Sequence, residues 1–357
     1  RKEVINSPAE FVIINFDGVA VVADDIKNAK FDLVIIDEAN AYKNARTKRF
    51  KVMKGIITHK TWLWMMTGTP AAQSPIDAYG LAKLCVPERA PQLYGAFRDM
   101  VMTQLTRFKW VPKPQATSVV HNVLKPAIRF EKRNCIDLPE VTHVFRHAPL
   151  SPQQSKYYKQ LKKDFLVSAA GEEVTAVNAA SKINKLLQIS CGCVYTDTKA
   201  VLEFDASSRM NTMLEVIEEA SHKVLVFVPF THTIDALKSF LDKNGVTNET
   251  INGSVSVSKR TEIFKEFQES DSLKVLLIQP QAAAHGVTLT AANVIIWYAP
   301  VTSSEIYLQA NARIDRPGQR NPMTIVHIEG SPEIGRAPRL NSSHGYISYA
   351  VFCLKKK

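Results

Sequence analysis

Two adjacent carboxylates, Asp37 and Glu38, follow directly after the apolar run of residues 33–36. A run of this kind predicts a buried strand, so the acids would stand at its carboxyl end. There, the first carboxylate can hold a hydrated Mg²⁺ ion and the second can orient a water for attack on a phosphate. Strands also end in an acid simply to meet solvent, and the pair alone does not decide between these interpretations.

A Thr-Gly-Thr-Pro turn at residues 67–70 follows the next apolar run. Small hydroxylated residues at a strand end can relay between a nucleotide site and a neighbouring surface. Farther along, Arg313 and Arg316 are three residues apart, which predicts one face of a helix. Guanidinium groups presented together suit bidentate phosphate contact and stabilise charge on a transferring phosphoryl group.

The helix that would carry the arginine pair has predicted ends. Thr302 and Glu305 form a capping-box pattern at its start, and Pro317 forbids its continuation past Arg316. A lone arginine pair is usually a solvated helix face. That interpretation weakens when an acidic strand end, a Thr-Gly-Thr-Pro turn and the arginine pair occur in order.

In the second half of the chain, the elements that must position these residues alternate regularly. Apolar runs at 224–228, 275–278, 294–297 and 324–328 alternate with segments in which apolar residues recur at helical spacing. Alternating strands and helices predict an α/β fold with a parallel sheet covered on both faces. Such sheets bind ligands at the carboxyl ends of their strands.

The first part of the chain suggests a second sheet domain of the same kind, with buried strands at 11–15, 33–36 and 61–66. The middle, about residues 90–208, is rich in proline and in mixed-charge stretches such as 153–165 and 176–189. We expect helical insertions there, together with the connection between the two domains.

The amino-acid composition limits the classes of protein to which this chain can belong. Lys and Arg number 45 against 34 Asp and Glu, a formal net charge of +11, which favours a polyanionic partner such as nucleic acid. The five cysteines lack the spacing of a disulfide framework or a zinc finger, and Cys191 and Cys193 are expected to be buried. No apolar run approaches membrane-spanning length, so we expect a soluble intracellular protein, in cytoplasm, nucleus or nucleoid, with viral origin left open.

The motifs and their order resemble the Swi/Snf family of helicase-like ATPases within helicase superfamily two. Asp37-Glu38-Ala39-Asn40 with the trailing Lys43-Asn44 looks like motif II, and residues 67–70 look like motif III. The segment between the family's two lobes is matched by Leu138-Pro139-Glu140, Leu150-Ser151, Gln154 and Tyr157 or Tyr158.

The second half carries further matches. The stretch leading into motif V is similar to Gly253-Ser254, Arg260, Phe267 and residues 281–289. Every fixed position of motif VI, Gln-Ala-x-x-Arg-x-x-Arg-x-Gly-Gln, is matched by Gln309, Ala310, Arg313, Arg316, Gly318 and Gln319. The resemblance extends over roughly residues 10–330.

The resemblance implies two RecA-like parallel-sheet lobes, the first incomplete, with helical insertions. Residues 1–148 would be the remainder of lobe 1 with motifs II and III, residues 149–330 lobe 2 with motifs IV to VI, and residues 331–357 an unassigned tail. ATP and Mg²⁺ would be the cofactors and duplex DNA the favoured partner. The implied catalytic residues are Asp37, Glu38, Arg313 and Arg316; the nucleotide-binding residues are Gln309, Gly286, Thr67 and Thr69; Asp37 would hold the metal.

Two departures from the family pattern matter. No G-x-x-x-x-G-K-[ST] phosphate loop occurs in the chain, and only 36 residues precede Asp37, which suggests that the front of the first lobe is missing. We therefore expect weak or absent ATP hydrolysis by this chain alone. Asn40 replaces the family's His, which alters hydrogen bonding toward Thr67 without removing a catalytic group.

Three functional hypotheses follow. The leading one is the motor part of a DNA-stimulated ATPase that moves on duplex DNA. The alternative is a binding module derived from a helicase core that grips nucleic acid without turnover. An RNA helicase of the same superfamily is disfavoured by the Lys43-Asn44 trailer. The basic residues Lys43, Arg46, Lys48, Arg49, Lys51 and Lys54 would either contact the DNA backbone or form a solvated helix face.

Overall fold

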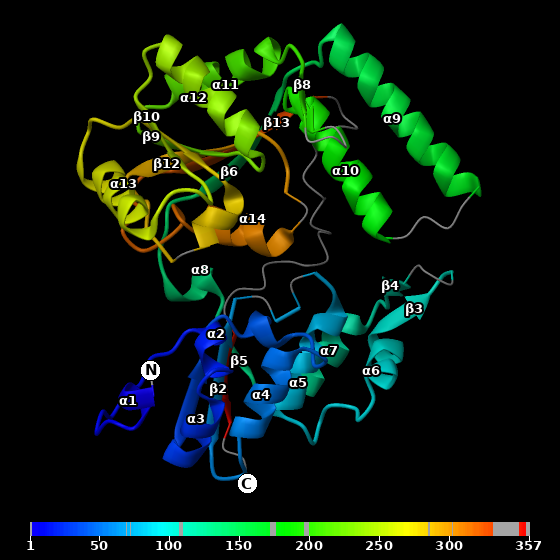
Figure 1. The fold of residues 1–357 in the computed structure, drawn as a ribbon, viewed down its shortest axis with the longest axis vertical. Helices are drawn as coiled ribbons and strands as arrows, with labels where there is room; N and C mark the ends of the chain where they lie inside the picture. The colour runs from blue at the N-terminus through cyan, green and yellow to red at the C-terminus, as the bar shows by residue number, and fades with distance from the viewer. Residues whose placement is uncertain are drawn as a thin grey trace. The chain divides into compact units, whose positions relative to one another are not determined.

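The computed structural model describes residues 2–68, 70–71, 73–106, 110–171, 176–195, 200–284, 286–301, 303–330 and 350–354. The chain divides into two compact units (Figure 1). Unit 1 comprises Arg1–Ile136 with His344–Lys357, and unit 2 comprises Asp137–Ser343.

Unit 2 is built on a six-stranded sheet in which every neighbouring pair of strands is parallel. In spatial order the strands are β10 (Asn248–Ile251), β11 (Val275–Ile278), β9 (Lys223–Phe227), β12 (Ala292–Trp297), β13 (Met323–Glu329) and β6 (Val141–His147). All four residues of β11 are buried, as expected for a strand covered on both faces. Four of these strands coincide with the apolar runs that the sequence predicted, and the predicted α/β fold is confirmed.

Helices cover both faces of this sheet (Figure 1). Helices α11 (Ser207–Glu219) and α12 (Thr231–Lys243) pack on one face, with Met213, Ile234 and Leu237 in their core. Helices α13 (Val257–Glu269) and α14 (Ser304–Asn311) pack on the other. The remaining elements are α9 (Pro152–Gly171), α10 (Ala176–Ser190), the hairpin β7 (Cys193–Tyr195) and β8 (Val201–Glu203), and the 3₁₀ turn η3 (Pro280–Ala284).

Strand β6 lies in unit 2 because it pairs with β13 over its whole length, from Val141 opposite Met323 to His147 opposite Glu329. The boundary between the units therefore falls after Ile136, earlier than the expected boundary after residue 148. The predicted helices at 153–165 and 176–189 are present as α9 and α10.

Unit 1 has a smaller sheet of order β1-β2-β14-β5. Strands β1 (Leu33–Ile36) and β2 (Trp62–Thr67) are parallel, and β14 (Ala350–Leu354) runs antiparallel between β2 and β5 (Ile128–Arg129). The main helices are α4 (Lys48–Ile56), α5 (Ala78–Cys85), α6 (Tyr94–Val101) and α7 (Ala116–Leu124). Short elements are α1 (Lys2–Ile5), α2 (Phe16–Val19), α3 (Ala23–Ala29), η1 (Ala39–Tyr42), η2 (Pro75–Asp77), β3 (Met102–Gln104), β4 (Trp110–Pro112) and α8 (Lys132–Cys135).

Two predictions for unit 1 were wrong. Residues 11–15 form no strand; Phe11 and Ile13 are exposed, and Asn15 instead caps α2 by accepting a hydrogen bond from the Gly18 N–H. Strand β1 is buried on one face only, because Ile36 enters the core while Ile35 stays 49% exposed. In the described part of unit 1, the helices cover one face of the β1–β2 pair.

The tail left unassigned by the sequence contributes β14, which pairs with β2 from Ala350 opposite Thr67 to Leu354 opposite Leu63. The rest of residues 331–357 lies outside the described residues. Among the described helices, none combines the length and the apolar character that a membrane span requires.

Candidate functional site

The acid pair stands at the carboxyl end of β1, as the sequence predicted. Both side chains are exposed, and the Glu38 N–H donates to Asp37 Oδ1 at 2.9 Å. Glu38 has a left-handed backbone with φ 47°, which costs a residue with a Cβ about 1–2 kcal/mol. Mg²⁺ keeps several waters and phosphate oxygens and needs only one or two carboxylates, and the exposed Asp37 carboxylate fits that demand.

The residues after the acid pair turn inward. Ala39, Asn40 and Tyr42 of η1 are buried, and burial raises the pKa of Tyr42. Asn40, which stands where the resembling family has His, is only 7% exposed. The acids therefore project to solvent from a turn whose other side is part of the unit 1 core.

Thr67, the first hydroxyl-bearing residue of the Thr-Gly-Thr-Pro turn, lies at the same edge of the sheet as the acid pair. Thr67 ends β2 and is buried, and the parallel register of Ile36 with Met65 places the carboxyl ends of β1 and β2 side by side. Thr69 lies outside the described residues. Asp37, Glu38 and Thr67 thus belong to one strand edge.

The prediction that Arg313 and Arg316 share a helix face was wrong. Helix α14 ends at Asn311, and the chain then runs through tight turns in which the Arg313 N–H donates to the Ala310 carbonyl. The Arg313 carbonyl accepts the N–H of Leu289, so it is not used for another helical turn. At the other end the N-cap is Ser303, whose Oγ accepts the Ile306 N–H; the predicted cap Thr302 lies outside the described residues.

The turn nevertheless brings the two guanidinium groups together. Arg316 Nη1 donates to the Gly286 carbonyl at 3.0 Å and to Thr288 Oγ1 at 3.2 Å. Arg313, only 4% exposed, and Arg316 both donate to the carbonyl of Val287, at 3.4 and 3.3 Å. The two stretches that the sequence matched to motifs V and VI, which follow β11 and β12 in the chain, therefore form one structural unit.

Gln319 holds this arginine turn in place. Its side chain is buried, Nε2 donates to the Ala292 carbonyl at 2.8 Å, and Oε1 accepts the N–H groups of Arg320 and Asn321. Gly318 has φ 98°, a backbone conformation that glycine adopts without strain. The last two fixed positions of motif VI, Gly318 and Gln319, therefore stabilise the turn.

Helix α14 is fixed to the sheet by ring contacts and two hydrogen bonds. Trp297 Nε1 donates to Asn311 Oδ1 at 2.9 Å, and the Tyr307 hydroxyl lies 3.2 Å from His327 Nε2. The Tyr307 ring packs against those of Trp297 and His327, and burial together with nearby His143 lowers the pKa of His327 to about 4. Half-buried Gln309 is carried on this anchored helix.

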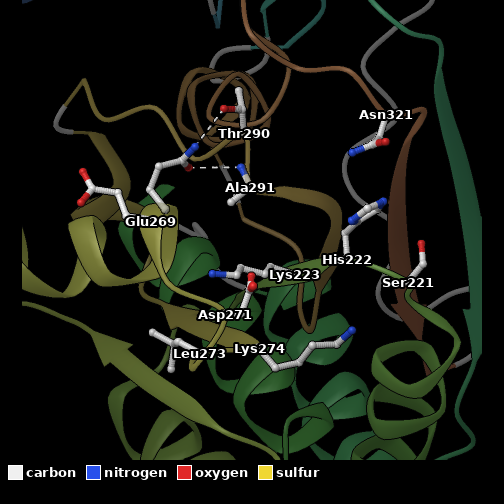
Figure 2. Close-up of a pocket in the computed structure, with 11 residues that line it drawn as sticks. Ser221, His222, Lys223, Glu269, Asp271, Leu273, Lys274, Thr290, Ala291 and Asn321 are labelled. Carbon is white, nitrogen blue, oxygen red and sulfur yellow. Dashed lines mark hydrogen bonds between the residues drawn. The ribbon is translucent and has the colours of Figure 1, made fainter.

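Two hollows in unit 2 lie at opposite ends of its sheet. The larger, about 430 Å³, is at the amino ends of the strands (Figure 2). The lysine side chains that line it donate hydrogen bonds to backbone carbonyls: Lys223 Nζ to that of Phe267 and Lys274 Nζ to that of Ala220. The smaller, about 270 Å³, is at the carboxyl edge, between Gln188 of α10, Phe230 after β9 and Ile306 of α14. The smaller hollow is also lined by Gln281 of the motif V stretch, whereas the larger is lined by Thr290, whose carbonyl accepts a hydrogen bond from Gln319.

Sequence patterns missed two residues that support these edges. Arg209 is buried in α11 and donates from Nε to the Tyr298 carbonyl at 2.8 Å and from Nη2 to the Ile328 carbonyl. Gly80 of α5 lies against the backbone that follows the acid pair. No motif marks either residue. Cys191 and Cys193 are buried as expected, and burial raises the pKa of Cys191 to about 12.

The fold is that of an α/β chain with two units, each built on a sheet. A model described as SNF2-related domain matches residues 3–195, and one described as helicase conserved C-terminal domain matches residues 208–318. The SNF2-related match covers more than half of the 357 residues. The chain belongs to the SNF2-related family, which confirms the resemblance to Swi/Snf proteins.

Two curated relatives are each at most 25% identical to this chain, and both are longer than it. The chain is 25% identical over 321 residues to mouse Chromodomain-helicase-DNA-binding protein 1-like, covering 86% of this chain and 35% of the relative. It is 23% identical over 337 residues to ATP-dependent DNA helicase DDM1 of Arabidopsis thaliana, covering 87% and 44%. The chain thus spans between a third and a half of the length of these relatives.

Among solved structures, the Sulfolobus solfataricus SWI2/SNF2 ATPase core in complex with dsDNA is 22% identical, with a TM-score of 0.43. That alignment covers 87% of this chain and 66% of the other. The C-terminal part of the Fun30 ATPase domain aligns with 61% of this chain at a TM-score of 0.48 and 15% identity, covering 94% of that chain.

Proposed function

We propose that this chain is part of the motor core of an ATP-driven translocase that moves on duplex DNA. The observation that carries the proposal is that each unit gathers the side chains of its motifs in one place. In unit 1, Asp37 and Glu38 stand at the carboxyl end of β1, beside the parallel strand β2, and parallel α/β sheets bind ligands at that edge. In unit 2, Arg313 and Arg316 converge on the Val287 carbonyl.

Each unit would contribute different groups to nucleotide chemistry. Asp37 would hold Mg²⁺ through its exposed carboxylate, and Glu38 would orient the attacking water. Arg313 and Arg316 would stabilise the charge that develops on the transferred phosphoryl group, because guanidinium donors match its oxygens. The nucleotide would be bound, and its state transmitted, by Gln309 on α14, Gly286 in the segment that Arg316 contacts, Thr67 at the acid edge, and Thr69, which lies outside the described residues.

Duplex DNA is the proposed partner. The formal charge of +11 favours a polyanion, and two of the relatives named above are described as a DNA-binding protein and a DNA helicase. On α4, Lys48, Lys51 and Lys54 are exposed, whereas Arg49 pairs with Asp17 at 2.8 Å and lies over the Phe16 ring. We therefore assign the phosphate contacts of this helix to its three lysines.

A non-hydrolysing DNA-binding module is the second candidate. It is favoured by one specific observation, the lack of a G-x-x-x-x-G-K-[ST] sequence in these 357 residues. Such a loop supplies the amides and the lysine that hold the β- and γ-phosphates. Under either candidate, the chain alone is expected to hydrolyse ATP weakly or not at all.

Radiolabelled phosphate release distinguishes the candidates. The protein as its gene encodes it would be assayed with Mg²⁺ and ATP, alone and with duplex DNA, single-stranded DNA or RNA. We expect duplex DNA to stimulate turnover most. Duplex binding without turnover would favour the binding module, and stimulation mainly by RNA would favour an RNA helicase. Robust turnover by residues 1–357 alone would contradict the requirement for a phosphate loop.

A further inference from the structure

The strained acid turn of unit 1 is held from behind by helix α5. After Glu38, with its left-handed backbone, the chain forms η1, whose residues Ala39, Asn40 and Tyr42 are buried. Helix α5 packs against η1, and all of its residues except Lys83 are buried. The acid turn therefore rests on a helix that is fixed in the core.

The contact between the helix and the turn is made backbone to backbone. Gly80 lies in the first turn of α5, where backbone N–H groups lack acceptors within the helix. The N-cap Asp77 makes no side-chain capping hydrogen bond, and the Gly80 N–H donates to the Lys43 carbonyl at 3.2 Å. The residue that follows η1 thus caps α5, and the helix in turn fixes that residue.

Only glycine permits this approach. A Cβ at position 80 would come within 2.5 Å of the Lys43 carbonyl carbon, and closer still to the carbonyl oxygens of Tyr42 and Lys43. These are backbone atoms, which cannot rotate away as a flexible side chain can. Any larger residue at position 80 must therefore push η1 away from α5, and Asp37 and Glu38 are joined directly to η1.

We propose that Gly80 is a positioning residue for Asp37 and Glu38, acting through η1. It touches neither carboxylate, and its effect is to set the place of the turn that carries them. The inference deepens the proposed function and rests on it, because it assigns to those acids the nucleotide chemistry described above. Displacement of catalytic groups by about 1 Å can cost on the order of 100-fold in rate.

The test is Gly80→Ala, with Gly95→Ala as the matched control. Gly95 also lies in the first turn of a helix, α6, but a Cβ there would meet no atom within 4 Å. Hydrogen exchange of residues 1–357 is measured by mass spectrometry. We expect Gly80→Ala to speed exchange of residues 37–47 about tenfold or more while β2 and α7 stay unchanged, and Gly95→Ala to leave all three segments unchanged.

Catalysis gives a second, independent readout. In the protein as its gene encodes it, Gly80→Ala is expected to lower kcat for DNA-stimulated hydrolysis about 100-fold with a smaller change in the KM for ATP. A smaller folded fraction would also lower the apparent kcat at unchanged KM, so kcat is referred to the concentration of folded protein, measured by circular dichroism under the assay conditions. If exchange rises only in residues 37–47 but the unaltered protein never hydrolyses ATP, the positioning role stands and the proposed function fails.

Other outcomes overturn the inference. Uniform acceleration across unit 1 would show that Gly80 supports the core in general, and no acceleration would show that the turn tolerates a Cβ. Should Gly80→Ala fail to fold, exchange of the unaltered chain at increasing urea decides. Residues 39–43 must then open together with α5; their opening independently of α5 would rule out the role.

Discussion

The two units support the side chains of their motifs differently. In unit 2 the arginine turn follows strands that are buried on both faces, and the buried side chain of Gln319 fixes it, while buried Arg209 holds the carbonyls of Tyr298 and Ile328. In unit 1 the acid pair ends a strand with one exposed face and rests on a turn pressed against α5. The side chains of the motifs are therefore supported by the sheet core in unit 2 and by packing of the following turn against α5 and β2 in unit 1.

This difference implies that the edges will respond differently to mutation. Damage to the unit 2 core should unfold that unit, because Gln319 and Arg209 donate hydrogen bonds directly to the backbone of β12 and β13. Damage to the support of unit 1 should displace the acids while leaving the sheet folded. The following predictions test that contrast, in order of decreasing effect.

Arg209→Met should cause the largest loss of stability. The substitution leaves the carbonyls of Tyr298 and Ile328 buried without the guanidinium donor, at about 1–3 kcal/mol each. We expect the free energy of unfolding of unit 2 to fall by about 3 kcal/mol, measured by urea titration with hydrogen exchange resolved by segment.

Arg146→Ala is the matched control for Arg209. Arg146 forms a partly exposed ion pair with Glu219, a contact worth about 0–1 kcal/mol. Equal losses from the two substitutions would contradict the role of Arg209 in holding the strand ends. A loss of exchange protection in unit 1 as large as that in unit 2 would remove the contrast between the units.

Acidification should destabilise unit 2 through His327. The pKa of His327 is lowered to about 4 in the folded state, against an ordinary value of 6.5, so the unfolded state binds the proton more tightly. The contribution of neutral His327 to the free energy of unfolding is therefore fully present above about pH 6.5 and is lost as the pH falls toward 4. Linkage gives a loss of about 2 kcal/mol between pH 7 and pH 5.

The contribution of His327 can be isolated with His327→Gln. His143, which faces His327 from β6, also has a lowered pKa and contributes in the same direction. Urea titrations at pH 7 and pH 5 should show a pH-dependent loss about 2 kcal/mol smaller in the variant. The same pH dependence in both proteins would show that His327 is not held neutral.

The smallest expected effect concerns DNA binding by α4. Lys48→Gln with Lys51→Gln removes two exposed charges, so the slope of log K against log salt should become shallower by about 2. The control pair, Lys259→Gln with Lys265→Gln on α13 of unit 2, removes lysines that pair with Glu262 and Glu269. Fluorescence anisotropy with a duplex DNA probe provides the measurement, and an equal change from both pairs would dismiss α4 as a contact surface.

The sequence could predict what periodicity and motif spacing encode. The buried strands of unit 2 stood out as apolar runs, and the acid pair was placed at a strand end correctly. The end of α14 could not be foreseen, because it depends on the Arg313 carbonyl accepting the Leu289 N–H, a contact between distant residues. Gly80 and Arg209 belong to no recognisable pattern, since their roles arise only from tertiary packing.

Residues 11–15 show the limit of local patterns. Their apolar composition favoured a strand, but a strand requires a neighbour to accept its backbone hydrogen bonds, and no described strand pairs with them. Likewise the exposed face of β1 cannot be read from the apolar run of residues 33–36, because burial depends on what packs against both faces.

DNA-stimulated phosphate release by two single variants tests the central claim most directly. In the protein as its gene encodes it, Glu38→Gln and Arg316→Lys should each lower kcat by about 100-fold or more, with melting temperatures unchanged. Such a result would show that unit 1 and unit 2 both act on the transferred phosphoryl group. Turnover at the unaltered rate in either variant would contradict the account.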